Sequence, residues 1–425
     1  VKYNINGEAY IDFKDPLAVQ KLTYTLLQHD FGLELDIPLD TLCPMIPNRL
    51  NYIHWLEDLI SYTGDDDHGE VYGFDIGTGT SCIYPLLGCT LNKNWKFVAT
   101  DISEKMVKLA KANVERNNLQ DRITIILKSN ESKLLLDDDD ETKNLDIQRF
   151  SFCMCNPPFY ENQEQYEAGV MFKKSQPFAT STGSPEEIFT NGGELGFIKQ
   201  IVDQSLVLRE RFSWYTSMIG RKETVNKIVS ELKKNKIDNY VLTEFCQGQT
   251  RRWGIGWSFG IHRPPSNISQ PSSKSLRKAG PSMTEFTTQW TIEINSLFEY
   301  LDTLLRTLEI RGTWNTATNT FTGNASTNTW SRAARRQRER EKAQQSQQQR
   351  QQQEKINMEL DSEPLFEFQY HLEQTEARSD NNVNGSITKM TMSWTSGNER
   401  NIFEAFYLHV KRRIEEKFGK SALRH

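Results

Sequence analysis

The run Cys155-Asn156-Pro157-Pro158-Phe159 places an amide, two prolines and an aromatic ring directly after an apolar stretch. Two prolines end a strand and stiffen the turn, so Asn156 is held at the strand's end. The Asn156 side-chain oxygen and the Pro157 carbonyl can both accept hydrogen bonds from one NH2 group, and Phe159 can stack on the plane that carries it. The motif therefore predicts a catalytic site that grips a planar amine, formed by Asn156, Pro157, Pro158 and Phe159.

A glycine turn lies upstream, in Phe74-Asp75-Ile76-Gly77-Thr78-Gly79-Thr80. Such a turn lets the methionine part of S-adenosylmethionine lie against bare backbone, and Ser81 could hydrogen-bond that portion. Asp101 ends the next strand-like stretch, 24 residues after Gly77, where an acidic side chain typically binds ribose hydroxyls. The sequence thus predicts S-adenosylmethionine as the cofactor, with these binding residues: Asp75, Gly77, Gly79, Ser81 and Asp101.

Together the two segments predict an amino-group methyltransferase. The sulfonium already activates its methyl group, so the reaction needs no metal and no strong nucleophile. The exocyclic amine of adenine is a poor nucleophile because its lone pair is delocalised into the ring. Two acceptors on its hydrogens favour the pyramidal form, so catalysis would come from positioning and electrostatics in a dry pocket. A base must leave its stack to reach such a pocket, and stacking on Phe159 offsets part of that cost.

Strand-like stretches alternate with helical ones through the first part of the chain. The strands are expected at 71–75, 96–101, 123–127 and 150–155. This alternation implies a parallel, doubly wound sheet, the class I or Rossmann-like α/β methyltransferase fold. The residues expected to bind the cofactor and the amine end these strands, which is the edge where open sheets bind ligands. Three further strand-like stretches complete the sheet, at 212–219, 242–245 and 254–261.

A chain of 425 residues is too long for one ordinary core, so two domains are expected. Residues 1–262 are predicted as the methyltransferase domain, and residues 1–70 form its helical N-terminal module. A stretch rich in Pro, Ser and Lys predicts a linker at 263–284. Residues 285–425 are expected to form a smaller α+β domain. An Arg/Gln-rich insertion at 331–357 has few apolar residues and is predicted to be disordered.

The charge and the composition exclude several classes of protein. The net charge of −5 argues against a uniformly basic nucleic-acid surface, although the blocks 332–355 and 411–424 carry +5 and +4. No run of about 18 apolar residues occurs, so no membrane span is expected. The six cysteines show no paired CxxC spacing and no nearby histidine, so no metal site is expected.

Asn156-Pro-Pro-Phe159 with the glycine turn resembles the class I N6-adenine methyltransferases. Three segments match more narrowly: Arg49-Leu-Asn-Tyr-Ile-His-Trp55, Asp75 to Leu87, and Thr243-Glu-Phe-Cys-Gln-Gly248. They resemble the methyltransferase-like-sixteen family, which writes N6-methyladenosine in U6 snRNA and is related to the bacterial 23S ribosomal RNA adenine-N6 methyltransferase. The resemblance covers about residues 1–262. For residues 285–425 it is weaker and points to an RNA-binding module similar to a kinase-associated domain.

This resemblance implies an RNA N6-adenosine methyltransferase that acts on structured RNA, namely U6 snRNA and, in some family members, messenger RNA hairpins. It implies a nuclear location, with a cytoplasmic one as a second site of action. It adds Arg49, Asn156 and Ser132 to the cofactor contacts. The RNA contacts that it implies are Lys14, Lys173, Lys174, Arg221, Lys222, Arg251 and Arg252.

Two other functions fit the same motifs. A protein glutamine N5-methyltransferase could use Asn156-Pro-Pro-Phe159 to grip a carboxamide NH2, with the same cofactor turn. A non-catalytic RNA-binding protein could retain the fold alone. The auxiliary domain and the narrow match at 243–248 favour RNA over a protein substrate. The intact residues Asn156, Phe159, Gly77 and Asp101 argue against a decayed enzyme.

Overall fold

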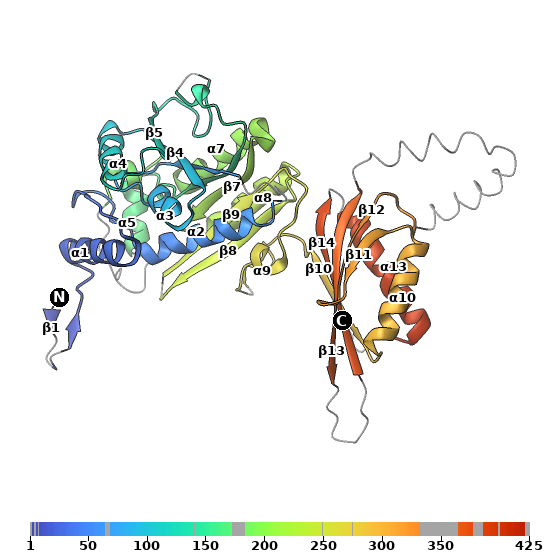
Figure 1. The fold of residues 1–425 in the computed structure, drawn as a ribbon. Coiled ribbons are helices and arrows are strands. Elements are labelled where there is room, and N and C mark those ends of the chain that lie inside the picture. Colours follow the sequence, from blue (N-terminus) through green and yellow to red (C-terminus); the bar gives the residue numbers. More distant parts are fainter. Residues whose placement is uncertain are drawn as a thin grey trace. The chain divides into compact units, whose positions relative to one another are not determined.

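A computed structural model describes residues 2–3, 6, 8–63, 69–138, 141–171, 183–248, 250–273, 275–331, 364–376, 386–397 and 400–420. The chain divides into two compact units. The first consists of Val1–Gly260 and Asn267–Pro281, and the second of Ile261–Ser266 and Ser282–His425. Each unit contains one large sheet with helices packed on it (Figure 1).

The first unit is built on a seven-stranded sheet in the order β5-β4-β3-β6-β7-β9-β8. All neighbouring pairs are parallel except those that involve β9, which runs antiparallel to both β7 and β8. The strands are β3 (Val71–Ile76), β4 (Trp95–Asp101), β5 (Ile123–Leu127), β6 (Phe150–Cys155), β7 (Phe212–Ile219), β8 (Tyr240–Gln247) and β9 (Thr250–Trp257). This arrangement confirms the predicted Rossmann-like α/β class, in a mixed rather than a purely parallel form.

The antiparallel strand β9 has a local cause. Gly248 follows β8 directly, with a φ of +57°, and Gln247 pairs with Thr250 across a two-residue loop. A loop this short can only join antiparallel strands, whereas a parallel partner needs a long crossover. The hairpin therefore inserts β9 between β7 and β8. The sequence pattern predicted a strand here but not its direction.

Helices cover both faces of this sheet, as its buried strands require. One core contains Tyr52, Leu56 and Leu86 with Phe152, and the other contains Phe74 and Phe150 with residues of α7 and α8. The helices of this unit are α1 (Pro16–Leu26), α2 (Ile46–Ile60), α3 (Ile83–Leu91), α4 (Glu104–Arg116), α5 (Gln163–Met171), α6 (Pro185–Ile188), α7 (Gly193–Leu208), α8 (Lys222–Lys234) and α9 (Ser266–Ser269). Shorter elements are β1 (Lys2–Tyr3), β2 (Ala9–Tyr10), a π-helical turn at Leu27–Phe31, and 3-10 turns at Glu141–Asn144 and Arg209–Arg211.

The stretch 263–284, predicted as a linker, is divided between the two units. Arg263 N donates to Thr395 O at 2.8 Å, which ties the start of the stretch to the second unit. Further along, Leu276 is buried in the first unit, and Tyr240 Oη donates to Gly280 O at 2.8 Å. The Pro, Ser and Lys residues correctly indicate an irregular backbone. A buried leucine and a few backbone hydrogen bonds are enough to hold that backbone against the two units.

The second unit is a five-stranded antiparallel sheet in the order β10-β14-β13-β12-β11. Its strands are β10 (Glu285–Trp290), β11 (Arg311–Asn315), β12 (Thr320–Ala325), β13 (Phe366–Glu376) and β14 (Ser386–Gly397). The helices α10 (Ile294–Thr307) and α13 (Arg400–Phe418) lie side by side on one face of this sheet (Figure 1). They enclose a core that includes Trp290, Phe366, Phe403 and Phe406. Beyond residue 331, the predicted insertion at 331–357 lies outside the described residues.

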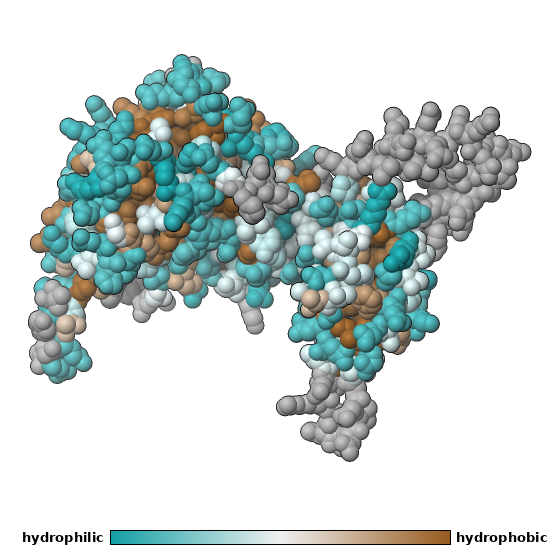
Figure 2. Space-filling model, in the orientation of Figure 1, coloured by the Kyte–Doolittle hydropathy of each residue, from teal (hydrophilic) through white to brown (hydrophobic). Residues whose placement is uncertain are grey.

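Hydrophilic residues dominate the visible face of the first unit, with smaller hydrophobic areas between them (Figure 2). In the described part of the chain, no helix combines the length and the apolarity that crossing a bilayer requires.

Gly73 in β3 gives a direct test of this packing. A Cβ atom at Gly73 would lie 2.5 Å from Phe97 Cε1 and 2.6 Å from Phe152 Cζ, on the neighbouring strands β4 and β6. We predict that Gly73→Ala lowers the free energy of unfolding by about 1–3 kcal/mol, because the rings must shift in a close-packed core. Thr124→Ala on the exposed side of β5 is the control and should change it by less than about 0.5 kcal/mol in the same urea titration. Equal stabilities for the two variants would contradict this packing.

Candidate active site

The predicted site residues meet at one edge of the first unit's sheet. β3 lies between β4 and β6, and its register pairs Ile76 with both Thr100 and Cys155. Because the three strands are parallel and in step, the residues that follow them emerge at the same level. The structure thereby brings together Asp75, the glycine turn, Asp101 and Asn156, as the sequence predicted.

The glycine turn is held by backbone contacts to β4. Gly77 and Gly79 have φ values of +70° and +63°, in the region that favours glycine. Gly77 N and Thr78 N both donate to Thr100 O at 2.9 Å, and Gly79 N donates to Asp101 Oδ2 at 2.9 Å. A Cβ at Gly77 would meet no atom within 4 Å, so the backbone there is open to a ligand. Ser81 follows this turn and is buried.

Asp75 is a buried carboxylate at the end of β3, with 1% of its surface exposed. Burial is the main reason that the pKa of Asp75 is raised to about 7, and the negative charge of Asp101 adds to this rise. The hydroxyl of Thr78 and the positive charge of Arg49 oppose it. Its Oδ2 atom is buried without a hydrogen-bond partner among the described residues. A buried acceptor of this kind is costly unless a ligand or water donates to it.

Arg49 lies in the first turns of α2 and is buried rather than on the surface. Its Nη1 donates to Tyr84 Oη at 2.8 Å, and its guanidinium carbon lies 5.2 Å from the centroid of the Tyr84 ring. The Arg49 Nε atom is buried without a partner in the described structure. Arg49 therefore supplies a positive charge and an unused donor near Asp75.

Asn156 follows β6, and its Oδ1 atom is buried without a partner in the part of the chain that the structure describes. Pro157 is buried and Pro158 is half-buried, which is consistent with a rigid turn. The strand end is anchored from α2, because Cys155 N donates to Tyr52 Oη at 3.4 Å and Tyr52 Oη lies 2.8 Å from Thr216 Oγ1. Asn156 therefore keeps a side-chain acceptor that no described protein group uses.

Phe159 packs beside Gly220, at the end of β7. A Cβ at Gly220 would come within 2.7 Å of Phe159 Cε1, so only glycine fits there. The guanidinium carbon of Arg252 lies 5.5 Å from the centroid of the Phe159 ring. Arg252 comes from β9, whose first residues lie at the same edge because this strand runs antiparallel.

Two acidic residues of this region were missed by sequence reasoning. Glu194 at the start of α7 is buried and accepts a hydrogen bond from Gly220 N, which fixes the backbone behind Phe159. Burial raises the pKa of the Glu194 carboxyl, against the effect of Thr224 and the Gly220 amide. Glu187 in α6 lies beside Gly79. The pair Gly192-Gly193 before Glu194 was the signal that could have indicated a close backbone approach.

The other predicted residues are more scattered. Ser132 lies in the turn after β5, and its hydroxyl is 3.0 Å from that of Ser129. Lys14 is exposed near the start of α1. Lys222 Nζ donates to Ser275 Oγ at 2.9 Å, and Arg251 pairs with Glu244 at 3.3 Å. The Arg221 guanidinium lies 4.9 Å from the Tyr160 ring. Lys173 and Lys174 lie outside the described residues.

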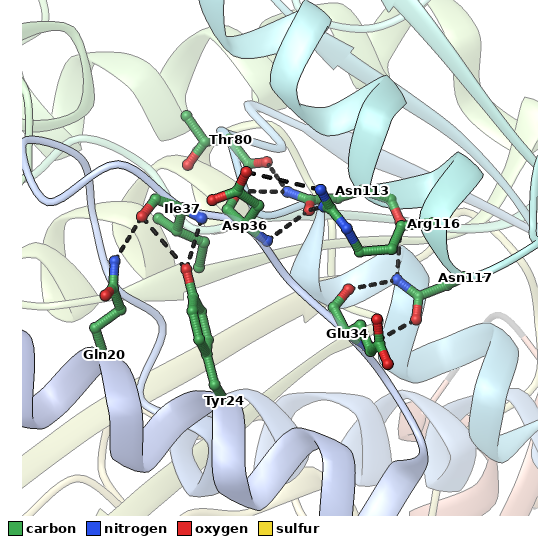
Figure 3. Close-up of polar contacts among 9 residues, drawn as sticks. All are labelled: Gln20, Tyr24, Glu34, Asp36, Ile37, Thr80, Asn113, Arg116 and Asn117. Carbon is green, nitrogen blue, oxygen red and sulfur yellow. Dashed lines mark hydrogen bonds and ion pairs between the residues drawn. The ribbon is translucent and has the colours of Figure 1, made fainter.

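A segment of the N-terminal module crosses α4 and reaches the glycine turn (Figure 3). The Asn113 amide pairs with the backbone of Asp36, accepting from Asp36 N at 2.8 Å and donating to Asp36 O at 3.0 Å. It also donates to Thr80 O at 2.9 Å. Asn117 pairs with the backbone of Glu34 in the same way, at 2.9 and 2.7 Å. The Asn113 side chain thus fastens the N-terminal module to the turn.

A family model described as RNA methyltransferase matches residues 1–260. The chain belongs to this family. Among the described residues, no group of three or more His, Cys, Asp or Glu side chains could hold a metal ion.

Several curated proteins are similar to this chain. The RNA N(6)-adenosine-methyltransferase METTL16 of Homo sapiens is 44% identical over 281 residues, which cover 65% of this chain and 48% of that protein. The U6 small nuclear RNA (adenine-(43)-N(6))-methyltransferase of Schizosaccharomyces pombe is 38% identical over 328 residues, 77% of this chain and 82% of the relative. The chain spans about half the length of the Mus musculus, Homo sapiens and Xenopus laevis relatives it matches.

A solved structure with the same architecture is the hMettl16 catalytic domain in complex with MAT2A 3'UTR hairpin 1. It is 43% identical, has a TM-score of 0.56, and the match covers 64% of this chain and 90% of that one. The complex with hairpin 6 is 45% identical, with a TM-score of 0.54 over 61% of this chain and 87% of the other.

The carboxyl of Asp75 predicts a pH dependence of stability. Its pKa in the folded protein, about 7, is above the ordinary value, so this group stabilises the fold fully below about pH 4 and loses that contribution as the pH rises through 7. We predict that the wild type becomes less stable relative to Asp75→Asn between about pH 4 and pH 8, by at most about 4 kcal/mol.

Urea titrations at several pH values measure this difference. Asp58→Asn, on the exposed side of α2, is the matched control and should leave the pH profile of the wild type unchanged. A stability difference between Asp75→Asn and the wild type that does not vary with pH would sink the prediction.

Proposed function

We propose that this chain is an RNA N6-adenosine methyltransferase that uses S-adenosylmethionine and acts on structured RNA. One observation carries the proposal: the Oδ1 atom of Asn156 is buried without a described partner, directly after β6 and three residues before Phe159 in the chain. An amide acceptor and a ring so placed match the needs of a planar amine. Membership of the RNA methyltransferase family supports RNA as the source of that amine.

The residues at the sheet edge fit the proposed cofactor. S-adenosylmethionine, when bound, supplies an electrophilic methyl group. Gly77 offers open backbone, and Asp101 can accept from ribose hydroxyls. Asp75 Oδ2 and Arg49 Nε are a buried acceptor and a buried donor without described partners, as a site for a zwitterionic amino acid requires. Ser81 and Gly79 complete this set, and Ser132 is a further contact in the proposal.

In this proposal the chain's own groups prepare the adenine. Asn156 Oδ1 and the Pro157 carbonyl accept from the two hydrogens of N6, which orients the nitrogen lone pair. Pro158 keeps the turn rigid, so the acceptors need no reorganisation. Phe159 stacks on the base and excludes water, while Gly220 and Glu194 hold the ring from behind. The base reaches this pocket only from a loop, a bulge or an opened pair.

The names of the relatives give the proposed substrates. We infer U6 snRNA as the first candidate, because the Schizosaccharomyces pombe relative is named for it, and messenger RNA hairpins as a second, because the solved relatives bind MAT2A 3'UTR hairpins. Such substrates agree with a nuclear location. In the proposal, the RNA backbone contacts basic residues of the first unit. These are Lys14, Arg221, Lys222, Arg251 and Arg252, with Lys173 and Lys174 from the part outside the described residues.

The experiment that tests the function is incubation with S-adenosylmethionine labelled in its methyl group and either U6 snRNA, total RNA or total protein from the source cells. Nucleoside analysis should find the label in N6-methyladenosine. Label in protein glutamine would support the protein glutamine N5-methyltransferase instead, and no label in any sample would leave only an RNA-binding role.

Asn156→Ala separates catalysis from binding. We predict a loss of methyl transfer of more than about 100-fold, because one acceptor that positions N6 is removed. RNA affinity, measured by fluorescence anisotropy, should stay within about threefold, since base contacts at one position carry a small part of it. An active Asn156→Ala variant would contradict the assigned role of Asn156.

The second unit is proposed to bind RNA. We predict that a chain ending at residue 281, the last residue of the first unit, binds structured RNA more weakly and methylates it more slowly at low RNA concentration. The reason is that two linked binding surfaces raise each other's effective concentration. Anisotropy titrations of the two proteins compare the affinities. An unchanged affinity after truncation would refute this role.

A further inference from the structure

Glu187 is a carboxylate at the glycine turn that neither the motif analysis nor the mechanism uses. It belongs to α6, the second helix after Asn156-Pro-Pro-Phe159 in the chain. Its Oε2 atom accepts hydrogen bonds from Ser184 N at 2.8 Å and from Leu42 N at 3.0 Å. The bond from Ser184 N caps α6 itself, and the bond from Leu42 N joins α6 to the N-terminal module.

The other oxygen of this carboxylate points at the turn. Glu187 Oε1 lies 3.5 Å from the position of a Cβ on Gly79. Gly79 N is itself bound to the carboxylate of Asp101, so two acidic side chains meet at the same glycine. Burial raises the pKa of the Glu187 carboxyl, the two backbone amides oppose this rise, and the charge of Asp101 adds to it. The negative charge is therefore unfavourable in the protein alone.

The two backbone hydrogen bonds that Glu187 accepts do not explain why a charged side chain is present here. A glutamine would accept the same two amide hydrogen bonds through its oxygen, without a charge to desolvate. Glu187 carries its charge beside the turn that follows β3. Asp75, near the end of β3, also has a buried oxygen without a described partner. Three acidic side chains around one open turn are an electrostatic arrangement suited to a cationic ligand.

We infer that Glu187 is a further cofactor-binding residue, whose charge favours the cationic methyl donor over the demethylated product. The inference rests on the proposed function. S-adenosylmethionine carries a sulfonium charge that S-adenosylhomocysteine lacks, while the two share their adenosine and amino-acid groups. A carboxylate at the turn stabilises the first through that charge and gains little from the second. Glu187 thereby binds the donor more tightly and aids release of the product.

The test compares two ligands on three proteins by calorimetry. The proteins are the wild type, Glu187→Gln and Glu186→Gln, and the ligands are S-adenosylmethionine and S-adenosylhomocysteine. We expect Glu187→Gln to weaken binding of S-adenosylmethionine roughly tenfold, as for one charge-assisted interaction, and binding of S-adenosylhomocysteine by less than about threefold. Glu186→Gln removes the same charge from the exposed neighbouring side chain, where solvent screens it, and should change either affinity by less than about twofold.

Other outcomes overturn the inference. Equal weakening of the binding of both ligands by Glu187→Gln would mean that Glu187 only caps the backbone. Tighter binding of both would make it a group that obstructs the turn. Thermal unfolding of the variants shows whether the fold is intact, and Glu187→Asp, which keeps the charge, should recover part of the preference for the donor. If the wild type binds neither ligand, the proposed cofactor fails, and that result is distinct from a failure at Glu187.

Discussion

The site depends on the register of three parallel strands. Ile76 of β3 pairs with Thr100 of β4 on one side and with Cys155 of β6 on the other, so the three strand ends lie level. A shift of one residue in either ladder would point the following side chains to the opposite face of the sheet. The large rings of Phe97 and Phe152, which close around Gly73, leave little space for such a shift. Core packing thus determines the positions of Asp101 and Asn156.

The polar groups at this edge carry an electrostatic cost. Asp75, Asp101, Glu187 and Glu194 all have pKa values raised chiefly by burial. Backbone amides of Gly79 and Gly220 partly compensate two of them, while Asp75 keeps an oxygen without a described partner. The positive charge of Arg49 lowers the pKa of Asp75 and that of Arg221 lowers the pKa of Glu194, so these cations offset part of the cost. Buried groups with perturbed pKa values cluster at functional sites, where a ligand can complete their interactions.

The sequence predicted the parts of this site that depend on local patterns. Glycines after a short apolar strand, an acid at the next strand's end and an Asn-Pro-Pro-aromatic turn each have a local physical meaning, and the sheet unites them. Contacts between distant segments were not predictable. Nothing local indicates that Glu187 reaches Leu42 N, or that Gly220 is the surface behind Phe159. The same holds in the second unit, where Thr329 Oγ1 donates to Leu308 O and Trp330 packs on Phe406.

The way in which α4 holds the N-terminal module constrains how this protein can diverge. Asn113 and Asn117 lie four residues apart on α4 and bind the main chain of Asp36 and Glu34, not their side chains. The two partners lie two residues apart, so the same pair of hydrogen bonds repeats along the segment. Any amino acid other than proline supplies the same N–H and C=O groups, so these hydrogen bonds do not depend on the residue types at 34 and 36. The Asp36 carboxylate adds only an ion pair with Arg116 Nη2 at 3.7 Å. An insertion or deletion of one residue would instead put the partners out of phase. The length of this segment should therefore be conserved more strictly than its amino-acid sequence.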